Sequence, residues 1–289
     1  MWQEYFRPET LAEALKMLSS GNGEARVIAG GTDLMLDLKK GSKKAKYLVD
    51  IRGIAGINVI EERGDKIFLG AGVTHTQAAT SWLIREKATA LAEAAALVGS
   101  LQIRNIGTIA GNIINAQPAA DTAVALVALE AQAEIALADG SRQVMKVEDL
   151  YAGPGKSKID STSSIVSGIY IPLRPNCRSN FQRIARRRSL ALPVINVAVV
   201  LGYENSSITS CSFAAGPVGP QPMRLREVEN FLIGKTLSDS IIEEAGNMAA
   251  DITQPRSSVL RGGREYRQHL IKVLINSFLR KYIQDRYKT

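Results

Sequence analysis

The sequence predicts an α+β protein of about two domains. Its 289 residues match the length of two average domains, and 45% of them are hydrophobic, which is enough to fill genuine cores. Up to Pro175, helical patterns alternate with short apolar runs that indicate buried strands. Beyond Pro175, extended runs come first and helices follow, as expected when an antiparallel sheet packs against helices. We therefore expect a first domain over residues 1–175 and a smaller one over residues 176–289.

The first predicted elements are a helix and two strands joined by a glycine turn. Thr10 and Glu13 form a capping box, and leucines at helical spacing follow on one face. Apolar runs at residues 27–29 and 47–49 indicate strands, and a pair of glycines comes directly after the first run.

The rest of the first domain mixes helices with strands. Thr74 and Gln77 can cap a helix that runs to Ile84, and Asp139-Gly140 is a typical hairpin turn. Further helices are expected over residues 88–98 and 121–129, and strands over residues 67–69, 135–138 and 165–171.

The second domain begins with predicted antiparallel strands over residues 181–185, 194–201 and 208–213. Helices follow, and the clearest is the last one. Its apolar stripe is Tyr266, Leu270, Val273, Leu274 and Phe278.

Charge and composition exclude several classes of partner. The net charge is +8, but the basic residues form short runs without interleaved aromatic residues, so we expect no nucleic acid. The only cysteines, Cys177 and Cys211, and the only histidines, His75 and His269, lack metal-ligand spacing, and we expect no metal. No secretion signal and no membrane-spanning apolar run is apparent, which predicts a cytoplasmic protein without a membrane partner.

Two glycine turns are candidate phosphate-binding sites. They are Ala29-Gly30-Gly31-Thr32-Asp33 and Gly107-Thr108-Ile109-Ala110-Gly111-Asn112. Glycine permits positive φ and removes the side chain that would keep an anion away, so successive amides can point at phosphate oxygens. Taken singly, either turn could equally be only a tight connection. Their occurrence in one domain favours a pyrophosphate between them.

Two other glycine-containing segments do not match known phosphate-binding motifs. Gly70-Ala71-Gly72 lacks the third glycine of a dinucleotide-binding fingerprint, and Leu150 stands where a P-loop ending in Gly155-Lys156-Ser157 requires glycine. Both are expected to be plain turns.

The surroundings of the two turns resemble a known family, the FAD-binding (medium) subunits of the molybdenum hydroxylases, or xanthine dehydrogenase family, and in particular carbon monoxide dehydrogenase flavoprotein subunits. The resemblance covers nearly the whole chain. The runs that carry it span residues 27–34, 70–74, 102–113, 118–121, 151–157 and 265–267.

The resemblance implies a fold, a cofactor and a set of contacts. The fold is an FAD domain of the vanillyl-alcohol-oxidase/p-cresol-methylhydroxylase type, with two α+β subdomains over about residues 1–54 and 55–175, followed by a smaller C-terminal α+β domain. Asp121 would bind the adenosine ribose, and residues 98–102 would approach the isoalloxazine. Val166 and the strand Phe181-Gln182-Arg183 would lie near the adenine or the edge of the flavin ring. The implied FAD contacts are Val27, Ile28, Ala29, Gly30, Gly31, Thr32, Asp33, Leu34, Val98, Gln102, Ile103, Gly107, Thr108, Ala110, Gly111, Asn112, Asp121, Val166 and Gln182.

Three positions depart from the family pattern. Ala110 stands where relatives often have glycine, and Gln117 where they usually have serine, which places one hydroxyl contact in doubt. Val98 replaces an aromatic residue that stacks on the flavin in some relatives.

The implied activity is that of an oxidoreductase subunit that relays electrons. A molybdenum-containing large subunit would oxidise the substrate, an iron–sulfur small subunit would pass electrons on, and FAD in this chain would deliver them to an acceptor such as NAD. Molybdopterin and iron–sulfur clusters would belong to the partners, and no side chain here need be catalytic. A stand-alone flavoenzyme of the same superfamily and a binding module without FAD remain alternatives.

Overall fold

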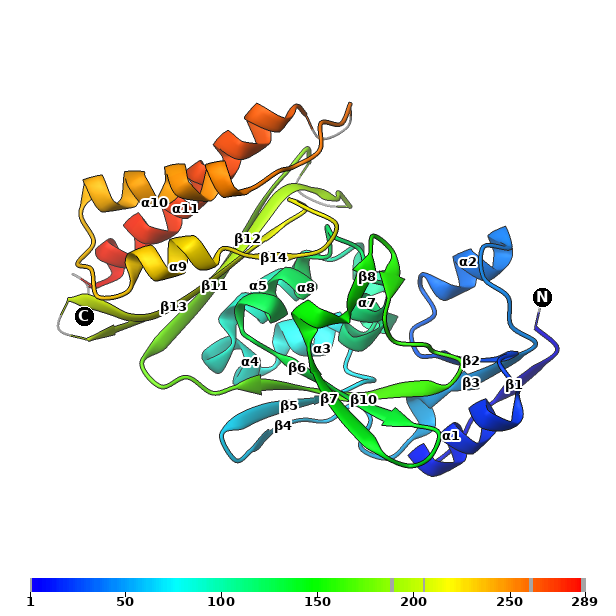
Figure 1. Cartoon of the computed structure of the whole chain (residues 1–289). Coiled ribbons are helices and arrows are strands. Elements are labelled where there is room, and N and C mark those ends of the chain that lie inside the picture. The colour runs from blue at the N-terminus through cyan, green and yellow to red at the C-terminus, as the bar shows by residue number, and fades with distance from the viewer. Residues whose placement is uncertain (1, 188–189, 205, 260–261, 287–289) are drawn as a thin grey trace.

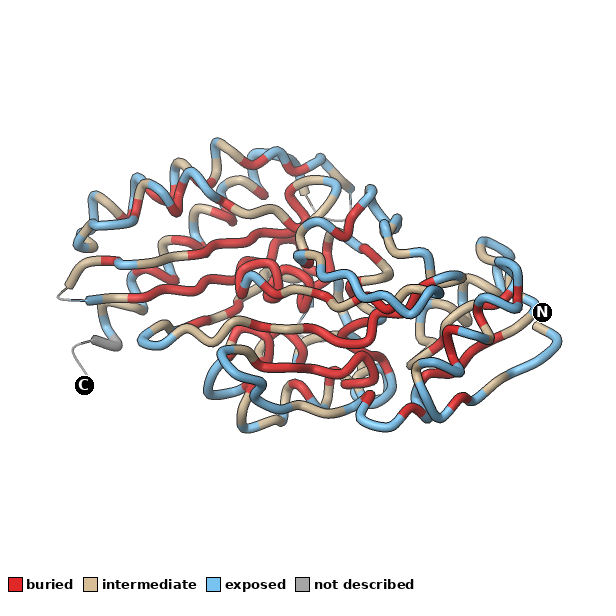
Figure 2. The backbone as a smooth tube through the Cα atoms, turned by 60° about the horizontal axis from the view of Figure 1, so that its bottom comes forward, coloured by how far each residue is buried: buried red, intermediate tan, exposed pale blue. Residues whose placement is uncertain are grey.

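The protein has the predicted α+β fold, with sheets and helices stacked in layers (Figure 1). The structure, a computed structural model, describes residues 2–187, 190–204, 206–259 and 262–286. In Figure 2 the buried residues follow the strands and helices of the central layers, while the outer turns are exposed.

The N-terminal unit is a small parallel sheet with one helix on each side of the first glycine turn. Thr10 and Glu13 form the predicted capping box of helix α1, whose Leu15 and Leu18 are buried. Residues 34–40, for which the sequence predicted no element, form a helix that begins directly after the glycine turn. The elements are β1 (Glu4–Phe6), α1 (Leu11–Ser20), β2 (Ala25–Ile28), α2 (Leu34–Lys40) and β3 (Tyr47–Asp50), with strand order β1-β3-β2. A short 3-10 turn, η1 (Ile51–Gly53), follows.

A five-stranded antiparallel sheet forms the next layer, in the order β4-β5-β10-β6-β7. The predicted hairpin at Asp139-Gly140 joins two of its strands. The strands are β4 (Ile60–Arg63), β5 (Lys66–Gly70), β6 (Gln132–Leu137), β7 (Arg142–Lys146) and β10 (Ser164–Pro172), and beside them lie η2 (Val147–Leu150), β8 (Tyr151–Gly153) and β9 (Lys156–Ser157).

Short helices cover one face of this sheet. The helix predicted to run to Ile84 is interrupted at Ser81, whose extended backbone ends one helix and whose hydroxyl caps the next. The helices are α3 (His75–Thr80), α4 (Trp82–Lys87), α5 (Thr89–Ala96), α6 (Leu101–Ile106), α7 (Ile109–Ile114) and α8 (Asp121–Ala128).

The C-terminal sheet lies on the other side of these helices. Its strands pair antiparallel in the order β11-β12-β13-β14, and α5 and α8 pack on one face while α9 and α11 pack on the other (Figure 1). The elements are β11 (Cys177–Ala185), β12 (Pro193–Glu204), β13 (Ser207–Gly216), β14 (Met223–Arg224), α9 (Arg226–Leu232), α10 (Asp239–Ile252) and α11 (Arg264–Arg286).

The apolar stripe of the last helix agrees with the prediction in part. Leu270, Leu274 and Phe278 are buried as expected, whereas Tyr266 and Val273 are exposed. Ile271 and Ile275 are buried in their place. None of the helices in the described ranges is both long and apolar enough to cross a membrane.

Candidate functional site

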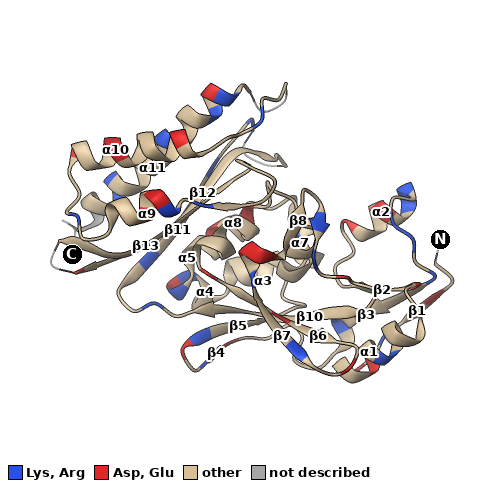
Figure 3. Cartoon of the chain, viewed as in Figure 1, with Lys and Arg blue, Asp and Glu red and all other residues tan. Residues whose placement is uncertain are grey.

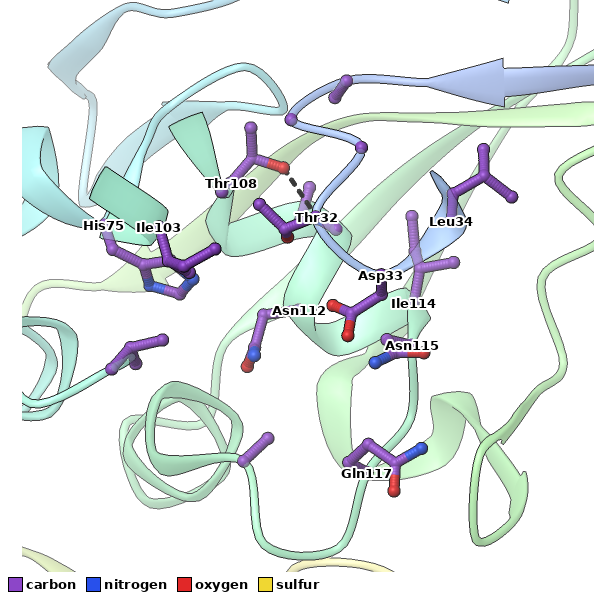
Figure 4. A pocket seen from close by; sticks show the side chains of 18 of the residues that line it. Thr32, Asp33, Leu34, His75, Ile103, Thr108, Asn112, Ile114, Asn115 and Gln117 are labelled. Atoms are coloured by element: carbon purple, nitrogen blue, oxygen red, sulfur yellow. Dashed lines mark hydrogen bonds between the residues drawn. The ribbon is translucent and has the colours of Figure 1, made fainter. Parts of the chain in front are cut away.

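A cavity of about 570 Å³ lies where the N-terminal unit, the short helices and the C-terminal sheet meet, within the size range of ligand pockets. Both glycine turns form part of its wall, and so do β10 and the segment that joins β11 to β12. Figure 4 shows side chains from both turns around one open space. The structure therefore brings together segments that are more than a hundred residues apart in the sequence.

The two glycine turns pack directly against each other. A Cβ on Gly30 would lie 2.0 Å from the carbonyl oxygen of Ile106 and 2.8 Å from Cα of Gly107. Gly31 has φ +69°, in the left-handed region that favours glycine. Position 30 thus requires glycine because the two turns touch there, and position 31 favours glycine because its φ is positive.

Backbone amides of both turns are unpaired in the described part of the chain. The amides of Gly30, Gly31, Thr32 and Asp33 donate no hydrogen bond there, and neither does that of Thr108. Backbone amides without a partner in the protein are open to an external acceptor, and several of them in one cavity wall suit a ligand with several acceptors. A pyrophosphate provides such acceptors, and these residues fit the FAD that the sequence implies.

The second turn is shaped by its threonine. Thr108 is 4% exposed, and its Oγ1 accepts a hydrogen bond of 2.9 Å from the amide of Gly111, which caps helix α7. Ala110 lies inside this helix and has no positive φ, so alanine in place of the family's glycine causes no backbone strain.

Asp121 is part of a buried polar cluster on the cavity wall. Its Oδ2 accepts a hydrogen bond of 2.5 Å from Nη1 of Arg183, and its Oδ1 one of 2.7 Å from Nδ2 of Asn196. Burial raises the pKa of Asp121, and the positive charge of Arg183 opposes that rise. The cluster joins α8 to β11 and β12, so a residue expected to contact the ribose also links the two halves of the chain.

Two predicted residues lie elsewhere. Gln102 is exposed on α6 and Gln182 lies on β11, and neither is part of the cavity wall, because the neighbouring Ile103 and Arg183 take that place. Their contact with FAD stays a prediction. The other predicted residues do line the cavity: Val27, Ile28, Ala29, Gly30, Gly31, Thr32, Asp33, Leu34, Val98, Ile103, Gly107, Thr108, Ala110, Gly111, Asn112, Asp121 and Val166.

The sequence analysis missed several cavity residues. His75, which is buried, and Asn115 were not expected there (Figure 4). Arg183, from the strand expected near the cofactor, and Gln117, which stands where relatives usually have serine, line the cavity as well. The charged residues are interspersed over all parts of the fold (Figure 3), and Arg26 and Lys43 bring positive charge to the cavity wall itself. This positive charge complements an anionic ligand.

Comparison with known proteins identifies the class. Residues 2–174 match the family described as the FAD binding domain in molybdopterin dehydrogenase, and residues 180–282 match the carbon monoxide dehydrogenase flavoprotein C-terminal domain. The fold and the cavity are therefore those of a flavin-binding oxidoreductase component.

Individual relatives are similar over nearly their whole length. The glyceraldehyde dehydrogenase medium chain of Sulfolobus acidocaldarius is 31% identical over 93% of this chain and 94% of its own. The nicotinate dehydrogenase FAD-subunit of Eubacterium barkeri is 32% identical over 89% of this chain and 90% of its own. The solved carbon monoxide dehydrogenase from Oligotropha carboxidovorans contains a chain with a TM-score of 0.88 and 27% identity, covering 96% of both chains. This chain belongs to the FAD-binding medium subunits of the molybdenum hydroxylases, the xanthine and carbon monoxide dehydrogenase family.

Proposed function

We propose that this chain receives electrons from the iron–sulfur clusters of a partner subunit and passes them, through FAD, to an acceptor such as NAD. The observation that carries the proposal is one cavity whose wall contains both glycine turns, with amides that have no partner in the described part of the chain. The relatives support it, since they are named as FAD subunits or medium chains of dehydrogenases. The partners we propose are a molybdenum-containing large subunit and an iron–sulfur small subunit.

The chain's own residues would bind and orient the cofactor. The two glycine turns would hold the pyrophosphate, and Asp121, fixed by Arg183 and Asn196, would present its carboxylate to the adenosine ribose. Val98 and Ile103, which line the cavity, would provide apolar contacts for the flavin. The redox chemistry is that of the bound flavin, and the protein contributes position and dielectric environment.

We propose the division into residues 1–175 and 176–289 as the domain organisation and the cytoplasm as the location. The two cysteines, Cys177 and Cys211, are free and apart from each other, which suits a reducing compartment.

Purification of the full chain tests cofactor binding. We expect flavin absorbance and close to one FAD per chain after denaturation, whereas a colourless chain that takes up no added FAD would refute the proposal.

Electron relay is tested in the complex. The flavin should be reduced by the complex's substrate only when the partner subunits are present. Reduction of the isolated, FAD-loaded chain by an organic substrate would instead favour a stand-alone flavoenzyme.

A further inference from the structure

We propose that the imidazole of His75 is a hydrogen-bonding partner of the bound FAD at the point where the two glycine turns meet. The proposal rests on the proposed function, because it requires FAD in the cavity. His75 begins helix α3, directly after the capping residue Thr74, and it lies outside both glycine turns. Its side chain nevertheless forms part of the cavity wall.

The backbone fixes His75 against the second glycine turn. The amide of His75 donates a hydrogen bond of 3.0 Å to the carbonyl oxygen of Gly107, and the amide of Ile109 donates one of 2.9 Å to Val73. These two bonds tie the start of α3 to the turn from both sides. The position of the imidazole is therefore set by the same contacts that set the position of the turn.

The imidazole also lies close to the first glycine turn. The Cβ that Gly107 lacks would lie 3.4 Å from Cδ2 of His75 and 3.5 Å from Oγ1 of Thr32, so these two side chains border the same small space. In Figure 4 the ring reaches from α3 into the space that Ile103 and Asn112 also border.

One nitrogen of this ring has no partner in the described part of the protein. His75 is 3% exposed, and its Nδ1 is buried without a hydrogen-bond partner among the described residues. A buried polar atom without a partner is costly, and a ring that served only to fill the core would more cheaply be leucine or phenylalanine. The neighbouring amides of the glycine turns also lack hydrogen-bond partners in the described part of the chain. One ligand with several polar groups would bond both the amides and the imidazole.

The low pKa of His75 keeps its imidazole neutral near pH 7. Burial and, to a smaller extent, the positive charge of Arg104 on α6 together lower the pKa of His75 to about 4. A neutral imidazole has one donor and one acceptor nitrogen, so it can bind a phosphate, ribityl or flavin group without adding a buried charge.

Nuclear magnetic resonance of the imidazole nitrogens provides a direct test, because the chain has only two histidines. The full chain would be labelled with ¹⁵N-histidine, stripped of flavin and titrated with FAD, and His269→Gln would assign the signals. We expect the His75 nitrogens to shift on binding and those of His269, which is exposed on α11, to stay unchanged. A parallel titration with ADP locates the contact, since a shift with ADP indicates the pyrophosphate half and a shift with FAD alone indicates the ribityl-flavin half.

Affinity provides the second measurement. His75→Leu should weaken FAD binding roughly tenfold, as expected for one lost hydrogen bond, and His75→Gln should recover part of the loss because its amide can donate and accept. Thermal unfolding without FAD checks that both variants fold. Unchanged FAD affinity in folded His75→Leu, or unmoved His75 signals in a wild-type chain saturated with FAD, would overturn the proposal. Failure of the wild-type chain to bind FAD would instead refute the proposed function.

Discussion

Gly30 and Ile106 touch so closely that a single methyl group on Gly30 would overlap the carbonyl oxygen of Ile106, 2.0 Å away. This contact joins the two glycine turns that form part of the cavity wall. The two turns can therefore lie in this position only because Gly30 has no side chain.

Gly30→Ala should push the two turns apart. We expect the free energy of unfolding to fall by about 1–3 kcal/mol, as for overpacked sites, and the FAD content of the purified chain to fall with it. Urea unfolding and flavin absorbance measure the two effects. Gly263→Ala is the matched control, since a Cβ there would have no atom within 4 Å. Equal FAD content in both variants would show that the contact between the turns does not shape the site.

Asp121→Asn should destabilise the protein by about 3 kcal/mol, because it leaves the charge of Arg183 buried without its partner. The Arg183 side chain is only 5% exposed. The double variant Asp121→Asn, Arg183→Met should recover part of this loss, since it removes the unpaired charge. Urea unfolding of the single and double variants provides the coupling free energy, and additive losses would mean that the pair is not coupled.

The ionisation of His75 should make the stability of the FAD-free chain depend on pH. The pKa of His75 is lowered to about 4 in the folded protein from an ordinary value of 6.5. Between these values the unfolded chain binds a proton that the folded chain does not, so stability falls as pH falls, by about 1.4 kcal/mol per pH unit.

Unfolding by urea at pH 7, 6 and 5 checks this slope. The His75→Leu variant should lose it, and His269→Gln, changed at an exposed histidine, should keep it. An identical slope in wild type and His75→Leu would assign the pH dependence to other groups.

Arg224 should contribute far more stability than Arg226. Its guanidinium bonds Glu229 through Nε and Nη2, both at 2.7 Å, and Glu130 through Nη1 at 2.8 Å, and it is 7% exposed. Arg224→Met leaves the buried Glu229 unpaired and should cost about 3 kcal/mol. Arg226 makes only a solvent-exposed pair with Glu148, so Arg226→Met should cost at most about 1 kcal/mol. Equal losses in thermal or urea unfolding would contradict this ranking.

The elements that the sequence predicted are those with a strong local signal. The capping boxes at Thr10 and Thr74 lie where expected, and the hairpin turn at Asp139 joins two strands. The short elements were missed because they lack such a signal. Strands β1 and β4 are mostly exposed, so they show no buried apolar pattern, and α7 has only six residues inside a motif interpreted as a turn.

The candidate site was predicted where it is continuous in sequence and missed where tertiary packing supplies it. Both glycine turns are short runs with characteristic residues. Only the family resemblance placed the strand of Arg183 near the cofactor, and Arg183 lines the cavity because β11 packs beside α5. His75 was missed, and it reaches the cavity because α3 is bonded to Gly107. The place of His75 directly after a helix cap was the one local hint, and it did not reveal which way the ring would point.

The cavity wall has one further consequence, since the C-terminal half supplies part of it. Arg183 and the residues 191–193 line the cavity, and β11 is joined to α5 by the amide of Ala90 on Ser179 at 3.1 Å and by the amide of Phe181 on Glu93 at 2.6 Å. A ligand held by both halves favours the state in which the halves are docked, in proportion to the logarithm of its concentration. Flavin supply in the cell would then regulate the lifetime of the polypeptide, because chains without cofactor would open more often between their halves and be degraded sooner.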